Sequence, residues 1–152
     1  MKIYTVSNKN EEKFLRHPPS LFDFKKYTKM EINEIVKAMK AEMEKADGIG
    51  LSANQIGLDI RVFVAKVDNK FYAIFNPKIT KKSADMADGE EGCLSIPGKY
   101  DEFPRPEKVT LDAHDKNGKK IKIKAWGLLA RVFQHEVDHL DGKLFVDHLK
   151  KK

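Results

Sequence analysis

The segment His135-Glu136-Val137-Asp138-His139 has the residue types and the spacing of a catalytic metal site. Two histidines four residues apart lie on the same face of an α-helix, so both imidazoles can bind one metal ion. The glutamate after the first histidine can exchange protons with a water bound to that ion. Leu128 and Val132 continue the same helical stripe. The stripe predicts that the histidines point inward, where a polar ring needs a partner.

A catalytic site of this kind needs three protein ligands and an open fourth position. Downstream, Phe145 occupies the position at which a metzincin-type protease places its third histidine. His148 is a poor candidate for the third ligand, because the chain is expected to turn away after the glycine that ends the helix. Upstream, Cys93 is the only cysteine and has glycine and proline residues on either side. A lone cysteine is most often a buried apolar side chain, but beside a histidine pair we interpret Cys93 as the third ligand. One thiolate and two imidazoles suit zinc or Fe(II).

Three segments, taken in order, carry a resemblance to a known family: Gly48-Ile49-Gly50-Leu51-Ser52-Ala53-Asn54-Gln55, Glu91-Gly92-Cys93-Leu94-Ser95 and the histidine segment. Together they resemble the motifs of the peptide deformylases, and the similarity extends from Phe14-Leu15-Arg16 to Lys143-Leu144-Phe145. The resemblance implies a metal-dependent hydrolase that removes the N-formyl group from formyl-methionine at the N-terminus of newly synthesised bacterial-type proteins. It points to Fe(II) as the native metal, with Zn(II), Ni(II) or Co(II) as alternatives.

The resemblance also implies roles for individual residues. Three residues would bind the metal: Cys93, His135 and His139. Glu136 would carry a proton from the attacking water to the departing amine. The side-chain amide of Gln55 and the backbone N–H of Leu94 would donate hydrogen bonds to the oxyanion. From the sequence alone, Gln55 could instead be a loop amide that caps local backbone.

The first two motifs further predict how a peptide binds. Glycines at positions 48 and 50 would let a peptide backbone approach closely, so an extended substrate could pair with the chain as an added strand. The residues expected to contact this substrate are Ile49, Gly50, Gly92, Leu128 and Val132. Three of them would form the apolar pocket for methionine, Ile49, Leu128 and Val132, although ordinary core packing explains the last two equally well. Arg131 would line the rim of this pocket or be exposed.

Several charged and aromatic positions keep two interpretations open. Asp47 and Arg105 resemble a family pair that braces the two active-site loops, but a plain surface location is equally consistent with the sequence. Asp138 and Asp141 are expected to solubilise the helix or to orient a histidine rather than to bind metal. Tyr100 stands where many bacterial members have an arginine, so a direct substrate contact from this position is left open.

The composition excludes several other classes of protein. The chain has 152 residues, a formal net charge of +6 and 41% hydrophobic residues. No apolar run approaches the ~20 residues of a membrane span, the N-terminus lacks the apolar core of a signal peptide, and one unpaired cysteine suits a reducing compartment. We therefore expect a cytoplasmic protein.

The excess positive charge fits either a solvated lysine-rich surface or a transient contact with the ribosome. No motif for sequence-specific binding of nucleic acid occurs. Some deformylases dock on the ribosome through a basic helix that follows the catalytic helix. Because this sequence ends at Lys150-Lys151-Lys152, that mode of docking is not assured.

The elements that must position these residues indicate an α+β fold in a single catalytic domain, residues 1–152, with antiparallel or mixed sheets packed around a central metal-binding helix. Residues 1–27 are expected to be an irregular arm. A helix begins at the capping box of Thr28 and Glu31 and is expected to end at Gly48. The metal-binding helix is predicted over 128–140 and ends before Gly142.

Two hairpins complete the predicted fold. One joins residues 61–67 to 71–75, and the other joins 109–114 to 119–124 around Asn117-Gly118. In the second hairpin, one face carries lysines and is expected to be solvated: positions 120, 122 and 124.

Two other functions fit parts of the pattern. A zinc endopeptidase that uses the same helix would need a third ligand after His139. A basic RNA- or ribosome-binding module with a structural metal would need four protein ligands, whereas only three are convincing here. Metal-dependent release of formate would distinguish all three functions.

Overall fold

The computed structural model describes residues 1–151. Lys152 and the side chains of Lys150 and Lys151 lie outside the described residues, and with them the C-terminal lysine run named above. The described α-helices are α1 (Lys9–Leu15), α2 (Lys29–Lys45) and α3 (Gly127–Leu140). Short 3₁₀ helices are η1 (Phe24–Lys26), η2 (Ala53–Ile56) and η3 (Phe145–Lys151). The strands are β1 (Gly50–Ser52), β2 (Val62–Val67), β3 (Lys70–Lys82), β4 (Met86–Cys93), β5 (Ile96–Pro106), β6 (Lys108–His114) and β7 (Lys120–Trp126).

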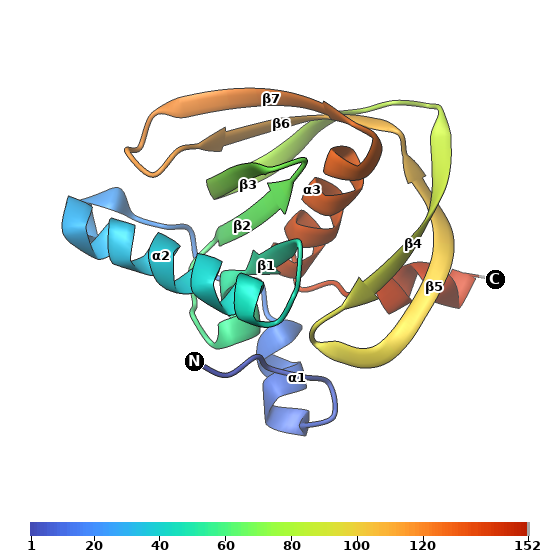
Figure 1. The fold of residues 1–152 in the computed structure, drawn as a ribbon, viewed down its shortest axis with the longest axis horizontal. Helices are drawn as coiled ribbons and strands as arrows, with labels where there is room; N and C mark the ends of the chain where they lie inside the picture. The colour runs from blue at the N-terminus through green and yellow to red at the C-terminus, as the bar shows by residue number, and fades with distance from the viewer. Residues whose placement is uncertain (152) are drawn as a thin grey trace.

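The strands of the described chain form two separate sheets around helix α3 (Figure 1). Five strands pair in the order β1-β2-β3-β6-β7, and β4 and β5 form a two-stranded ribbon. All of these pairings are antiparallel. Helix α3 lies between the five-stranded sheet and the ribbon (Figure 1). The arrangement confirms the predicted α+β fold around the helix that carries the histidines.

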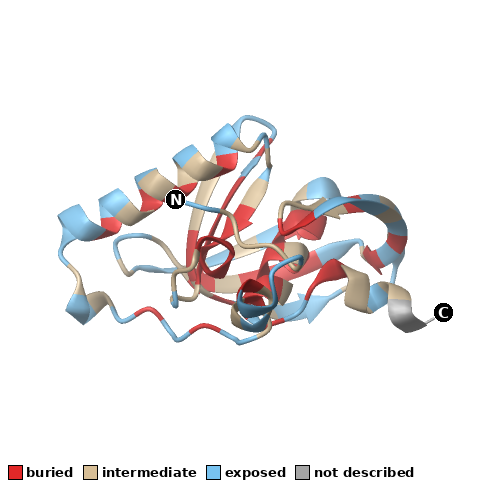
Figure 2. Cartoon of the chain, turned by 90° about the horizontal axis from the view of Figure 1, so that it is seen from below, coloured by how far each residue is buried: buried red, intermediate tan, exposed pale blue. Residues whose placement is uncertain are grey.

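Strand β2 lies in the core because its side chains are buried on both faces of the sheet. Phe63 and Ala65 pack in one apolar cluster with residues of α3, whereas Val62 and Val64 pack in a second cluster with residues of α2. Alternate side chains of a strand point to opposite faces, so one strand can serve both helices. Buried residues gather where the helices meet the sheet, and exposed residues cover the outer surface (Figure 2).

Both predicted hairpins are confirmed. β2 and β3 are joined by Asp68 and Asn69, whose φ angles of 53° and 63° give the two left-handed residues of a tight hairpin turn. β6 and β7 are joined by a loop in which Gly118 has a φ of 80°. The lysines of β7 lie on the exposed face of that strand, as the alternation predicts.

The helix boundaries differ from the prediction at two places. The irregular arm expected over residues 1–27 contains α1, which begins where the Asn8 side chain accepts hydrogen bonds from two backbone N–H groups. Helix α2 ends before Asp47, and Asp47 rather than Gly48 takes the left-handed conformation that ends the helix. The backbone N–H of Gly48 donates to the carbonyl of Met43 in the same capping motif. Gly142, with a φ of 75°, ends α3 as predicted. No helix in the described chain is long and apolar enough to span a membrane.

Candidate metal centre

Helix α3 presents its histidines on the face opposite the one that packs on the sheet. Phe133 and Val137 are buried in the cluster with the five-stranded sheet. Because the helix turns 100° per residue, His135 and His139 face the other way, toward the ribbon. Leu140 is the last helical residue, and capping by Gly142 keeps His139 within the regular part of the helix.

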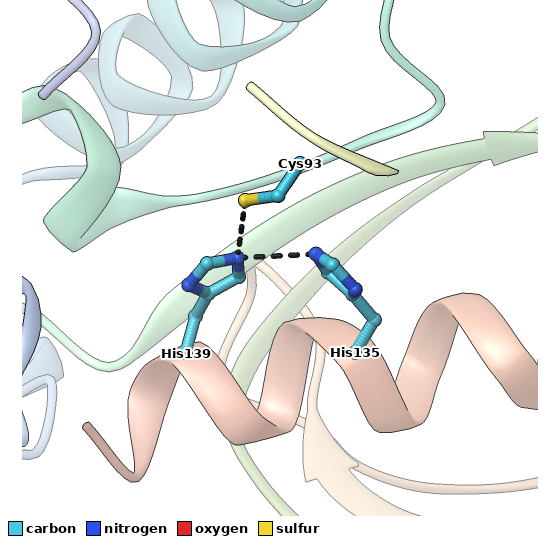
Figure 3. Close-up of side chains that lie close together, drawn as sticks. All are labelled: Cys93, His135 and His139. Carbon is cyan, nitrogen blue, oxygen red and sulfur yellow. Dashed lines mark hydrogen bonds between the residues drawn. The ribbon is translucent and has the colours of Figure 1, made fainter. Parts of the chain in front are cut away.

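The structure brings the three predicted ligands together (Figure 3). Cys93 is the last residue of β4, and its Sγ lies 3.2 Å from His139 Nε2. The Nε2 atoms of His139 and His135 are 3.1 Å apart. All three ligand atoms lie within 4.8 Å of one another. Two elements far apart in the sequence, the ribbon and α3, therefore share one site.

The donor atoms fit a metal ion. Atoms that coordinate one tetrahedral zinc are about 3.3–3.6 Å apart, close to the separations of the two nearest pairs here. Burial raises the pKa of the Cys93 thiol, but the charges and hydrogen bonds of His139 and His135 outweigh burial and hold this pKa well below its usual value. The site thus favours the thiolate, which is the form that binds metal. Three protein ligands leave one position for a reactant, as in catalytic sites.

Glu91 orients His135, a role that no pattern in the sequence predicted. Its Oε1 lies 2.8 Å from His135 Nδ1, and its carboxylate also accepts hydrogen bonds from Arg105 and Arg131. Burial raises the pKa of Glu91, but the hydrogen bonds with His135 and Arg105 lower it to about 2. The ionised carboxylate keeps the proton on Nδ1 and leaves the Nε2 lone pair for the metal. Glu91 stands two residues before Cys93, and that position in the chain does not by itself show which group its carboxylate contacts.

Glu136 lines the same cleft as Cys93 and His135, with one carboxylate oxygen unpartnered in the described chain. The residue is 3% exposed, lines the cleft described below, and its Oε1 has no hydrogen-bond partner among the described residues. Burial raises the pKa of Glu136, although the two histidines lower it. A Cβ atom placed on Gly50 would lie 2.5 Å from Glu136 Oε2, so the glycine makes room for this carboxylate. The arrangement suits a group that accepts a proton and returns it.

Gln55 makes the local capping contact that the sequence allowed, and its orientation leaves the oxyanion role open to it. Its Oε1 accepts the backbone N–H of Ser52 at 3.0 Å, which is a local capping contact. Its Nε2 donates to Ser95 Oγ at 3.0 Å and lies 3.6 Å from Cys93 Sγ. Local capping therefore fixes the amide with its N–H groups toward the metal ligands. Leu94, the other predicted oxyanion donor, lines the same cleft.

A cleft of about 480 Å³ opens in front of these groups. All five residues expected to contact substrate line it: Ile49, Gly50, Gly92, Leu128 and Val132. Val132 is buried, as core packing would also require, but Ile49 and Leu128 are 49% and 55% exposed. Core packing therefore does not explain Leu128. Strand β1 is an edge strand, so its outer backbone groups are open to pairing with an extended peptide.

Arg105 lies elsewhere than expected, whereas Arg131 lines the cleft, which is one of the two places predicted for it. Arg131 is buried at 9% exposure and bonds to the ribbon, so the alternative of an exposed side chain is wrong. Arg105 is also buried and pairs with Glu91 and Asp138 rather than with Asp47. Both arginines thus link the ribbon to α3.

The remaining predicted positions lie at the edges of the site. His148 Nε2 contacts Asp138 at 2.9 Å, so Asp138 orients this histidine and not a metal ligand. Asp141 pairs with Arg61 at 3.0 Å. Tyr100 is 68% exposed, and its ring lies over Gly92 at the cleft. Because His148 is directed to Asp138, the downstream ligand that an endopeptidase would need is missing from the described residues.

The sequence model of the polypeptide deformylase family matches residues 2–152 of this chain. The chain belongs to the peptide deformylase family. A peptide deformylase of Treponema pallidum is 44% identical over 122 residues, which cover 80% of this chain and 75% of the relative. The crystal structure of a probable peptide deformylase from a Synechococcus phage has a TM-score of 0.87 and 38% identity, covering 97% of this chain and 98% of that one. The crystal structure of peptide deformylase 1B of Arabidopsis thaliana in complex with an inhibitor has a TM-score of 0.87 and 39% identity. The match covers 97% of this chain and 80% of that one.

The family assigns the reaction that takes place in the cleft. This deformylase is a hydrolase that removes the N-formyl group from N-formylmethionyl nascent peptides, a step of protein biosynthesis. The family is metal-dependent, and the three converging ligand atoms give this deformylase a place for the ion. The two other functions considered from the sequence, an endopeptidase and a binding module with a structural metal, are therefore wrong.

Proposed function

We propose that Cys93, His135 and His139 hold the catalytic metal of this deformylase and that Glu136 moves the protons. One observation carries the proposal. The buried carboxylate of Glu136, with an oxygen unpartnered among the described residues, lines the same cleft as Cys93 and His135, whose ligand atoms converge with that of His139. Neither a structural metal site nor a packed core explains that combination, because a buried carboxylate without a partner is costly.

When bound, the ion supplies a water of lowered pKa and polarises the formyl oxygen. Glu136 accepts the proton of the attacking water and delivers it to the amine nitrogen as the bond from carbon to nitrogen breaks. Gln55 and Leu94 donate N–H groups to the negative charge that develops on the formyl oxygen. Support for Gln55 comes from its orientation, since Ser52 holds its Oε1 and leaves Nε2 facing the centre.

The substrate lies extended along the open edge of β1, with its backbone beside Ile49, Gly50 and Gly92. The methionine side chain occupies the apolar part of the cleft formed by Ile49, Leu128 and Val132. The test measures formate released from formyl-Met and formyl-Asp peptides and acetate released from an acetyl-Met peptide. We expect the first to react far faster than the other two. Comparable rates for formyl-Met and formyl-Asp would refute the pocket, and release of acetate at a comparable rate would refute the specificity for formyl.

Fe(II) is proposed as the native ion, in preference to Zn(II), Ni(II) or Co(II). A thiolate at Cys93 bound to a redox-active ion beside an open position is exposed to oxidation. The same apoprotein loaded with Fe(II) or Zn(II) should therefore lose activity in air only in its iron form. Equal stability of the iron form in air and under nitrogen, or higher turnover with zinc, would contradict iron as the native ion.

We also propose that the enzyme works in the cytoplasm and contacts the ribosome transiently through its basic surface. The exposed lysines of β7 at positions 120, 122 and 124 support this proposal, because a row of like charges attracts an acidic partner. Co-sedimentation with ribosomes should weaken when these lysines are replaced by glutamate and when salt is raised. Unchanged sedimentation of the variant would refute a contact through this face.

A further inference from the structure

The metal site is assembled from two pieces of structure that are not continuous in the sequence. Helix α3 supplies His135 and His139, and the ribbon of β4 and β5 supplies Cys93. Three ligands must be placed within a fraction of an ångström to share an ion. Contacts that hold the ribbon at a set distance from α3 therefore decide the geometry of the site.

Arg131 joins α3 to the ribbon through three hydrogen bonds. It lies one turn before His135 on α3, and its guanidinium reaches across to both strands of the ribbon. One Nη donates to Glu91 Oε2 at 2.6 Å. The other donates to the carbonyls of Ala87 on β4 at 2.7 Å and Phe103 on β5 at 3.0 Å. The side chain is buried, so these bonds are made in a medium where charge-assisted hydrogen bonds are strong.

We propose that Arg131 is a positioning residue, which fastens the ribbon to α3 so that Cys93 and the histidine pair can share one ion. A planar guanidinium donates to three acceptors in fixed directions, whereas the ammonium of a lysine is a rotatable point charge. Arg131 also shares the carboxylate of Glu91 with His135, so its loss affects both the ribbon and the orientation of a ligand. The inference rests on the metal site proposed above.

Gly89 provides an independent sign of this role. A Cβ atom at Gly89 on β4 would lie 2.6 Å from Arg131 Nε and 2.9 Å from its Cζ. The backbone of Gly89 is not in the left-handed region, so the lack of a side chain is explained by space and not by conformation. The ribbon thus has a gap at the point where the guanidinium lies. A methyl group there would displace the guanidinium without removing any hydrogen-bonding group.

The test measures zinc affinity, by competition with a chromophoric chelator, and the visible absorption of the cobalt-loaded protein. The variants are Arg131→Met, Gly89→Ala and the two combined. Lys37→Met is the control, since it removes one positive charge from an exposed position of α2. We expect about a tenfold loss of zinc affinity in each single variant, at the lower end of what loss of an outer-shell partner costs. The combined variant should bind as Arg131→Met does, because the alanine then meets no guanidinium.

The cobalt spectrum separates positioning from general stability, because it reports ligand geometry at full occupancy. We expect it to change in both single variants and to be unchanged in Lys37→Met. Parent-like affinity and spectrum in Arg131→Met would overturn the proposal. If Arg131→Met does not fold, Gly89→Ala decides alone, and a parent-like result there overturns the proposal equally. If the parent itself binds no stoichiometric metal, the proposed metal site fails, which is a different outcome.

Discussion

Replacement of Gly50 by alanine distinguishes two reasons for a glycine at this position. The sequence suggested that Gly50 lets the substrate backbone approach, whereas the structure places the missing side chain against Glu136. A Cβ atom at Gly50 would lie 2.5 Å from Glu136 Oε2, so the carboxylate would have to withdraw by about 0.9 Å to reach an ordinary contact of 3.4 Å. The same Cβ atom would also lie 3.2 Å from Val132 Cγ1, so the alanine methyl group has no free space on that side either.

A displacement of this size is costly in catalysis. A misplacement of about 1 Å in a reacting group can reduce the rate by about 10²-fold. We therefore expect Gly50→Ala to lower kcat for formyl-Met peptides by about 10²-fold, with metal content and KM close to those of the parent. Steady-state rates of formate release, with metal analysis of the same preparation, measure all three quantities.

Gly48→Ala is the matched control, because it makes the same chemical change two residues away. A Cβ atom there would meet Leu94 Cδ1 at 3.0 Å, which is the movable end of a flexible side chain. We expect less than a tenfold loss of kcat. A rise in KM with unchanged kcat in Gly50→Ala would refute the reasoning, since it would mean that the glycine serves substrate approach and not the carboxylate.

Three further perturbations follow from the site and the core. Cys93→Ala should leave little bound metal after dialysis, measured by elemental analysis, and full stoichiometry would refute its role as a ligand. Glu91→Gln replaces a carboxylate whose pKa is lowered to about 2, and zinc affinity should fall about 10–100-fold. Competition with a chelator measures the affinity. An unchanged affinity would contradict the orienting role of Glu91. Phe133→Ala removes a fully buried ring in edge contact with Phe63 and Tyr72, and urea unfolding should show a loss of about 3–5 kcal/mol; a loss under 1 kcal/mol would contradict the packing described.

Much of the fold could be predicted because local chemistry and tertiary structure agree. The capping box of Thr28 and Glu31 is formed, and the turns at Asn69 and Gly118 join the strands that alternation predicts. Helix α1 was missed because seven residues are too short for a periodic apolar pattern. The ribbon was missed because β4 and β5 carry charged and glycine residues at positions where an alternating pattern is expected.

In the site, the sequence predicted the three side chains that the structure brings together but not the residues that hold them in place. His135 and His139 are related by helical spacing, and Cys93 was found because it is the only cysteine. The roles of Glu91, Arg105 and Arg131 depend on contacts between residues 14 to 44 positions apart, which no local pattern records. Burial of these arginines was also hidden from the sequence, because charged residues are seldom buried unless paired and their partner Glu91 is distant in the chain.

The most direct test of the proposed mechanism compares Glu136→Gln with the parent enzyme in two measurements, bound metal and formate release from a formyl-Met peptide. The glutamine keeps the size of the side chain but cannot accept and return a proton. We expect stoichiometric metal in both proteins and a loss of turnover of about 10²–10⁴-fold or more in the variant, the contribution of general acid–base catalysis. Parent-like turnover would contradict Glu136 as the proton carrier, and loss of the metal would show that Glu136 is a ligand instead.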